Sequence, residues 1–159
     1  MNAIVGTLLD SGQWKSAIYA GLGGAIAIAL LAQIGELTEL HLLIPPFGAS
    51  CVLAFGFPSS PFARMRNIIG GHFISALVGL AACTVFGAGI LGVSVGVGLA
   101  ISAMMLTDTV HPPAGANPVV VALTQPQISF LIFPVLVGAA AIVILSALFQ
   151  KVTSQERPR

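Results

Sequence analysis

The chain has 159 residues, of which 57% are hydrophobic and 7% are charged, and its formal net charge is +1. Typical globular chains carry roughly 25% charged residues, so this one cannot cover a water-exposed surface, and we expect a membrane protein. The small net charge, without a basic or acidic run, argues against a nucleic-acid partner. Two cysteines, Cys51 and Cys83, indicate neither a disulfide framework nor a zinc ribbon. We expect no metal and no cofactor.

Apolar windows predict four long helices of membrane-spanning length, at residues 16–35, 67–86, 90–107 and 129–150. Two shorter apolar stretches, residues 44–58 and 112–123, are opened by a Pro-Pro pair and form either crossings or re-entrant hairpins. Charge favours crossings, because all basic residues then lie on the cytoplasmic side, as the positive-inside rule requires. These residues are Lys15, Arg64, Arg66, Lys151, Arg157 and Arg159. The prediction is an all-α membrane protein with six crossings and both termini inside.

This topology divides the chain into a cytoplasmic segment at residues 1–15, a transmembrane domain at residues 16–150 and a cytoplasmic tail at residues 151–159. The first residues lack the basic region of a signal peptide. We therefore expect the first helix to remain in the mature protein, and we expect a bacterial inner-membrane location.

The two short stretches are copies of one pattern, 67 residues apart. Residues 45–50 read Pro-Pro-Phe-Gly-Ala-Ser, and residues 112–117 read Pro-Pro-Ala-Gly-Ala-Asn. Each half of the chain, about 16–86 and 90–150, then reads long helix, broken short helix, long helix. Two halves with three crossings each have opposite topologies, which predicts an inverted repeat. In transporters of this kind, paired Pro- or Gly-interrupted segments mark the substrate site.

The repeated segments suggest a site for a small anion. Pro is favoured at the first helical position, so a half-helix is expected to begin after each Pro pair and to leave backbone amides free for a ligand. Two alternatives remain: a water channel that uses the same device, and structural segments whose amides are capped locally. The candidate substrate-binding residues are Pro46, Phe47, Gly48, Ala49, Ser50, Pro113, Ala114, Gly115, Ala116 and Asn117.

Three motifs give the chain a resemblance to a known family. The run His111-Pro112-Pro113 carries the tripeptide after which the HPP family of small integral membrane proteins is named, and residues 46–50 and 66–72 are similar to its other two signature stretches. Plant plastid and cyanobacterial members are described as nitrite transporters. The resemblance thus implies transport of nitrite, by a fold usually described with four transmembrane helices.

Several other polar residues are candidates for proton transfer or gating, because ionisable groups inside a membrane are costly. Asp108 and His111 could pair or relay a proton, or they could form an end-cap in cytoplasmic water. His72 could be a second proton group or a packing histidine. Arg66, followed by Asn67, could attract anions or only fix the topology.

Small residues recur every four positions at Gly71, Ser75, Gly79, Cys83 and Gly87, and again at Gly92, Gly96 and Ala100. This spacing favours close helix packing in lipid, and so small a bundle suggests a homo-oligomer such as a dimer. The sequence lacks the hydrolase motifs H-E-x-x-H and G-x-S-x-G, so we expect no enzyme. Transport of a small anion, most simply nitrite, is the leading hypothesis; a channel for anions or other solutes and a non-transporting assembly subunit are the alternatives.

Overall fold

The computed structural model describes residues 13–154, whose regular elements are all helical. The α-helices are α2 (Gln13–Thr38), α3 (Pro46–Cys51), α4 (Met65–Phe86), α5 (Ile90–Leu106), α6 (Asn117–Thr124) and α7 (Val137–Ser154). Short π or 3-10 turns are η1 (Val52–Gly56), η2 (Pro61–Ala63), η3 (Pro112–Ala116), η4 (Ile128–Leu131) and η5 (Ile132–Leu136). The predicted all-α class is confirmed for these residues. The predicted segment 1–15 and tail 151–159 lie largely outside them.

The six predicted helical stretches are all present. Three of the four predicted long helices are α2, α4 and the stretch from η4 to the end of α7, whereas the fourth, α5, has 17 residues and is one of the shorter apolar helices. Each Pro-Pro stretch is a composite: α3 runs on into the π turn η1, and the 3-10 turn η3 runs on into α6. Helix α4 stops where Gly87 takes a φ of 78°, a conformation that suits glycine because it has no Cβ.

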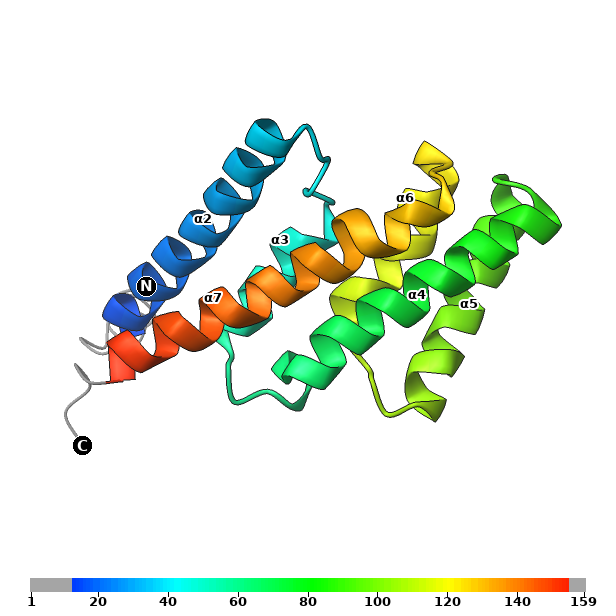
Figure 1. Cartoon of the computed structure of the whole chain (residues 1–159). Coiled ribbons are helices and arrows are strands. Elements are labelled where there is room, and N and C mark those ends of the chain that lie inside the picture. Colours follow the sequence, from blue (N-terminus) through cyan, green and yellow to red (C-terminus); the bar gives the residue numbers. More distant parts are fainter. Residues whose placement is uncertain (1–12, 155–159) are drawn as a thin grey trace, which may run out of the picture.

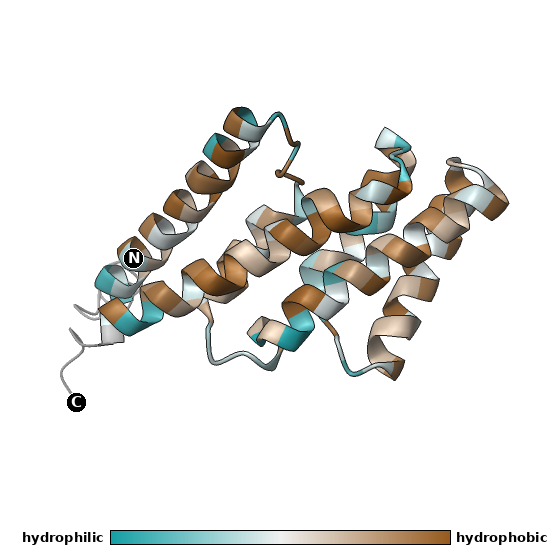
Figure 2. Cartoon of the chain, in the orientation of Figure 1, coloured by the Kyte–Doolittle hydropathy of each residue, from teal (hydrophilic) through white to brown (hydrophobic). Residues whose placement is uncertain are grey.

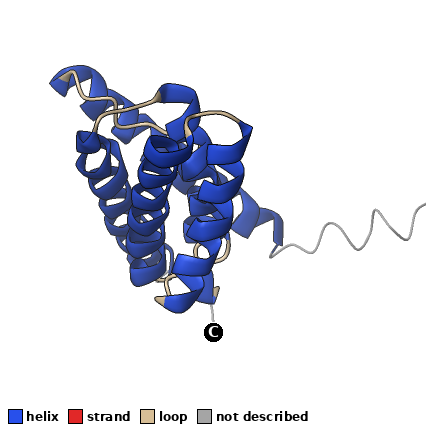
Figure 3. Ribbon diagram, turned by 90° about the vertical axis from the view of Figure 1, so that its right-hand side faces the viewer, coloured by secondary structure: helices blue, strands red, loops and turns tan. Residues whose placement is uncertain are grey.

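Helices α4 and α7 form the middle of the molecule, with α2 and α5 on opposite flanks (Figure 1). Helix α5 packs mainly on α4 and α6, whereas α2 packs on η1 and α7. Successive stretches run in alternating directions, so the start of α2, the connection before α4, the connection after α5 and the end of α7 lie at one end of the bundle. Seen from the side, the helices stand next to one another (Figure 3).

The described helices carry an apolar surface suited to lipid. Three stretches, Gln13–Thr38, Met65–Phe86 and Ile128–Thr153, are long and apolar enough to cross a membrane, and two shorter apolar helices are Pro46–Gly56 and Ile90–Leu106. Along α2, large side chains such as Ile18, Leu22 and Ile26 are exposed. Hydrophilic residues gather at helix ends, including the start of α4 and the end of α7 (Figure 2). An apolar exterior of this extent indicates a membrane protein.

The predicted stripe of small residues brings α4, α5 and α6 together. A Cβ added to Gly79 would lie 2.8 Å from Cα of Pro118, and one added to Gly96 would lie 3.2 Å from Cβ of Pro118 and 3.8 Å from Cα of Gly79. Pro118 therefore sits where two glycines leave room for it. The close packing predicted for these small residues is present at this contact.

Candidate functional site

The start of each broken segment is capped by its own backbone. In the first segment, the amide of Phe47 donates to the carbonyl of Ile44 (3.0 Å), and the amide of Gly48 donates to the carbonyl of Pro45 (3.1 Å). In the second, the amide of Ala114 donates to the carbonyl of His111 (2.9 Å). A Pro pair removes two amide donors and favours a turn that bonds the next ones. The expectation of free amides is therefore not met, and local capping, the alternative noted above, describes these residues.

The glycines of the repeat face outward rather than toward a buried ligand. Gly48 and Ala49 are exposed, as is Ala116, and Gly115 is half-buried. A Cβ added to Gly48 or to Gly115 would meet no atom within 4 Å. The backbone at these positions is open, but no enclosed anion site surrounds it.

Four polar side chains meet instead on the inner side of the two broken segments. Ser50 of α3, His72 of α4, His111 before η3 and Asn117 of α6 each have no exposed surface. Ser50 Oγ lies 2.8 Å from Nε2 of His72 and 2.8 Å from Nε2 of His111. Nδ1 of His72 lies 3.2 Å from Nδ2 of Asn117. We call these four residues the polar cluster.

The partners at the two ends of the polar cluster fix the direction of its hydrogen bonds. Nδ1 of His111 lies 2.8 Å from the carbonyl oxygen of Phe62, which only accepts, so this nitrogen carries a proton. In a neutral imidazole Nε2 then accepts, and it receives the hydroxyl proton of Ser50. Ser50 in turn accepts from Nε2 of His72, whose Nδ1 accepts from the amide of Asn117. Asn117 also donates to the carbonyl of His72 (2.9 Å).

Packing holds the two imidazoles in place. The ring of Phe47 meets His72 edge to face, with centroids 5.1 Å apart, and His72 and His111 are also 5.1 Å apart. Gly71 makes room for the second broken segment, because a Cβ there would lie 2.7 Å from Cβ of His111. Ser75 donates to the carbonyl of Ala114 (2.6 Å), which fastens η3 to α4.

The predicted candidates Arg66, Asn67 and Asp108 form a separate group at the end of the bundle. Asp108 does not bind His111; it pairs with Arg66 at 2.5 Å, and both side chains are mostly exposed. Arg66 also donates to the carbonyl of Asp108 (2.6 Å), and Asn67 donates to that of Val110 (2.8 Å). These contacts clamp the 107–111 connection onto the start of α4, directly above the buried His111.

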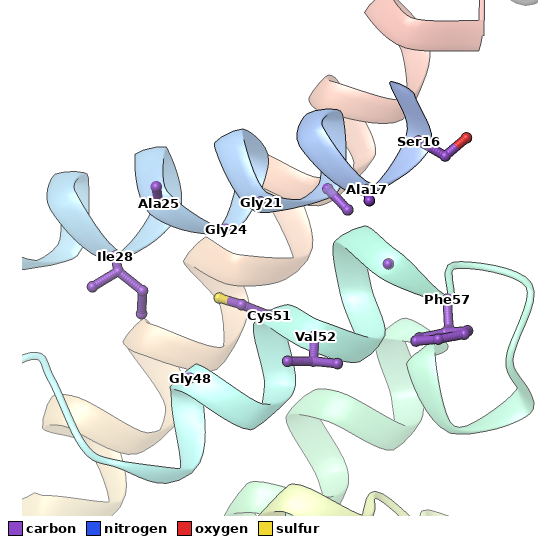
Figure 4. A pocket seen from close by; sticks show the side chains of 12 residues that line it. Ser16, Ala17, Gly21, Gly24, Ala25, Ile28, Gly48, Cys51, Val52 and Phe57 are labelled. Atoms are coloured by element: carbon purple, nitrogen blue, oxygen red, sulfur yellow. The ribbon is translucent and has the colours of Figure 1, made fainter. Parts of the chain in front are cut away.

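A groove of about 640 Å³ lies on the opposite side of α3, between this helix and α2. Gly48 and Cys51 lie on the side of α3 that faces α2 (Figure 4). Ala17, Gly21 and Gly24 form much of the opposite wall. The groove is apolar and does not include the polar cluster, so it resembles a lipid-facing surface more than an ion site.

The chemistry open to the polar cluster is limited by its composition. The described residues contain no group of three or more His, Cys, Asp or Glu side chains that could hold a metal ion. Ser50, His72 and Asn117 stand in the order of a hydrolase triad, but Ser50 has no exposed surface. What remains is a set of neutral donors and two protonatable rings. The sequence singled out all four residues, and also Phe47, but not that they meet. It did not single out Phe62, whose carbonyl binds His111.

Comparison with known proteins places the chain in a family. The family model described as "HPP, transmembrane region" matches residues 9–158, and the chain belongs to this family. It is 36% identical to a transmembrane protein of Dictyostelium discoideum over 138 residues, which are 81% of this chain and 48% of that protein. A second D. discoideum transmembrane protein is 35% identical over 109 residues, 65% of this chain and 35% of the relative. The chain thus spans about half or less of these curated relatives, and no solved structure matches it.

Proposed function

We propose that this HPP transmembrane protein carries a small inorganic anion, most simply nitrite, across the membrane, and that the polar cluster is its substrate site. The observation that carries the proposal is the complete burial of Ser50, His72, His111 and Asn117 inside an apolar helical domain. Polar groups at membrane depth are expensive and are by default functional. The resemblance of the HPP motifs to those of nitrite-transporting members supplies the substrate.

The composition of the polar cluster favours an anion over a cation. It contains hydroxyl, amide and imidazole groups, all of which can donate, and it contains no carboxylate. The nearby acid, Asp108, is already paired with Arg66 at the rim. A small oxyanion would find donors there without meeting a fixed negative charge.

The closed state of the polar cluster favours a carrier over an open pore. None of its four side chains has exposed surface, so substrate access requires helices to separate. The broken segments are the natural moving parts, since each is short and joined to the bundle by connections. A channel for anions or other solutes is the second candidate, and a non-transporting assembly subunit is the third.

We further propose that the two halves form an inverted repeat. A two-fold relation requires reciprocal contacts: if a residue of one half meets a residue of the other, their repeat equivalents must also meet. Such a pair exists, because a Cβ on Gly71 would lie 2.8 Å from the carbonyl oxygen of Thr109, and one on Gly138 would lie 3.3 Å from that of Leu42. The two contacts are related by the 67-residue offset found in the sequence.

The proposed topology has six crossings, both termini in the cytoplasm and a bacterial inner membrane as the location. It is supported by the basic residues, since Lys15, Arg64, Arg66 and Lys151 all lie at or next to the helix ends gathered at one end of the bundle. Cysteines replacing the exposed Ser59 and Gln127, in a background without Cys51 and Cys83, should label from opposite sides of the membrane. Labelling from one side contradicts six crossings.

Nitrite uptake into proteoliposomes tests the function, with nitrate, formate and chloride as competitors. A carrier predicts saturable uptake and nitrite counterflow, whereas a channel predicts conductance without counterflow. His72→Ala should lose uptake. His41→Ala is the matched control, because His41 is exposed and lies in the connection between α2 and α3. Folded protein that moves none of these anions would leave the assembly subunit as the remaining candidate. Cross-linking in the same vesicles tests the homo-oligomer expected from the sequence.

A further inference from the structure

We propose that the polar cluster binds one additional proton, and that the Ser50 hydroxyl reorients so that Nε2 of His111 can carry it. The proton then travels with the anion, a coupling that rests on the function proposed above. The proton site itself rests only on the contacts of Ser50, His72 and His111.

Ser50 lies within hydrogen-bond distance of one more acceptor than it uses in the neutral polar cluster. Besides the two Nε2 atoms at 2.8 Å, its Oγ lies 3.1 Å from the carbonyl oxygen of Pro46, one helical turn earlier. In the neutral state the hydroxyl donates to His111 and accepts from His72, so the carbonyl of Pro46 receives nothing from it. A hydroxyl has one proton and two acceptor positions.

When one proton is added, the same atoms form hydrogen bonds in a different arrangement. The proton binds at Nε2 of His111, whose Nδ1 continues to donate to the carbonyl of Phe62. Nε2 now donates to Ser50, which also accepts from His72 as before. The hydroxyl proton of Ser50 turns from His111 to the carbonyl of Pro46. No heavy atom needs to move, and Ser50 and both imidazoles keep hydrogen-bond partners in both states, as a buried network favours.

The surroundings leave this proton as the one mobile charge at the site. Helices α5 and α6 contain no titratable residue, and α7 has only Lys151, in its last turn. The other thiol, Cys83, lies on α4 eleven residues beyond His72, and α2, which packs on α3, carries Lys15, Tyr19 and Glu36. On α3, Cys51 lines the groove on the opposite side of the helix. At the rim, Arg66 and Asp108 neutralise each other. A proton on His111 thus gives the polar cluster a charge of +1, which compensates one monovalent anion and lowers the cost of moving that anion through the membrane.

The proton site can be tested without transport. Nitrogen-15 NMR of histidine-labelled protein in lipid should show His111 protonated at Nδ1 and His72 at Nε2 at neutral pH, with exposed His41 as the third and independent signal. Acidification should place one proton, not two, on the pair. Ser50→Ala should abolish this pattern, and Ser50→Thr, which keeps the hydroxyl, should restore it. Independent titration of His72 and His111, or an unchanged pattern in Ser50→Ala, overturns the proposal.

Ser75→Ala is the matched control, because Ser75 is an equally buried serine whose hydroxyl donates to the carbonyl of Ala114 and not to a histidine. It should lose stability while keeping the NMR pattern. For coupling, nitrite uptake at high pH should fall by about tenfold per pH unit, the slope of a single bound proton, and Ser50→Ala should flatten this slope. A normal NMR pattern without nitrite uptake refutes anion transport alone. Uptake with a flat slope in the parent protein refutes the coupling alone.

Discussion

The two broken segments share a sequence pattern but differ in what they bring to the interior. Both begin with a Pro pair and cap their first amides locally. The first segment contributes Ser50 alone to the polar cluster, whereas the second contributes both Asn117 and the adjacent His111. At the 67-residue offset, His111 corresponds to Ile44 and His72 to Ala139, and both of these apolar residues are buried.

Their packing differs as well. The second segment is held closely on one side, where Pro118 lies against Gly79 and Gly96. The first segment lines the groove beside α2, to which the second segment contributes no residue. The two broken segments thus share one backbone arrangement, but most of the polar side chains lie at the second segment. Because the second segment, the adjacent His111 and α4 supply three of the four polar side chains, we propose that they hold the ions, while the first segment, which lines the groove, moves.

The largest effect is expected at the glycines that seat the two segments. In the Gly71→Val protein, the new side chain would meet backbone at the carbonyl of Thr109, and in Gly138→Val it would meet the ring of Phe47. Each change should cost about 1–3 kcal/mol or more through overpacking. Because backbone yields less than a side chain, Gly71→Val should lose more than Gly138→Val. Thermal unfolding in detergent measures both.

The controls are Gly21→Val and Gly98→Val, since a Cβ at either position has nothing within 4 Å. Equal stability losses in all four proteins would mean that the contacts at Gly71 and Gly138 do not set the cost. Similar losses for the Gly71 and Gly138 variants alone would indicate that the two segments are held equally firmly.

A smaller effect on stability but a large one on transport is expected for His72. His72→Leu keeps the volume filled but leaves Ser50 and Asn117 each without one hydrogen-bond partner. The loss should be about 1–3 kcal/mol, with nitrite uptake reduced on the order of tenfold or more, as expected for a lost binding group. Ala139→Ser, at the equivalent place in the other half, should leave uptake near the parent value. If Ala139→Ser impairs uptake as strongly as His72→Leu, the site is symmetric.

The sequence predicted the helical frame well and the contacts of the site poorly. Hydropathy and the Pro pairs sufficed to locate six helical stretches, because these signals are local. The polar cluster joins residues 50, 72, 111 and 117, which approach one another only after the stretches have packed. Spacing suggested that Asp108 could pair with His111, but Asp108 turns to Arg66 on a different helix. Free amides were expected because a Pro pair can start a helix. The sequence does not show that carbonyls just before each segment accept hydrogen bonds from these amides.

The clamp at the end of the bundle should matter little to stability. Asp108→Asn removes the charge that pairs with Arg66, but both side chains are mostly exposed, so water and salt already weaken the interaction. We expect a loss of at most about 1 kcal/mol in unfolding experiments. Asn67→Ala, which removes the partly buried bond to the carbonyl of Val110, should lose somewhat more. A larger stability loss for Asp108→Asn than for Asn67→Ala would show that the ion pair is the main contact holding the 107–111 connection on α4.

The smallest effect is expected at the glycines of the repeat, and it separates two models of the site. If an anion were held by amides near Gly48 and Gly115, a bulky side chain there would obstruct it. The structure instead has those first amides bonded within the chain, with open space where a Cβ would stand. Gly48→Val and Gly115→Val should therefore fold with little change in stability, because helix propensity does not disfavour Val relative to Gly, and they should retain nitrite uptake. Uptake by both variants at half the parent rate or better would place the substrate with the polar cluster. Folded variants that no longer transport would return the site to the outward faces of the broken segments, and the groove beside Gly48 would then become part of the anion path.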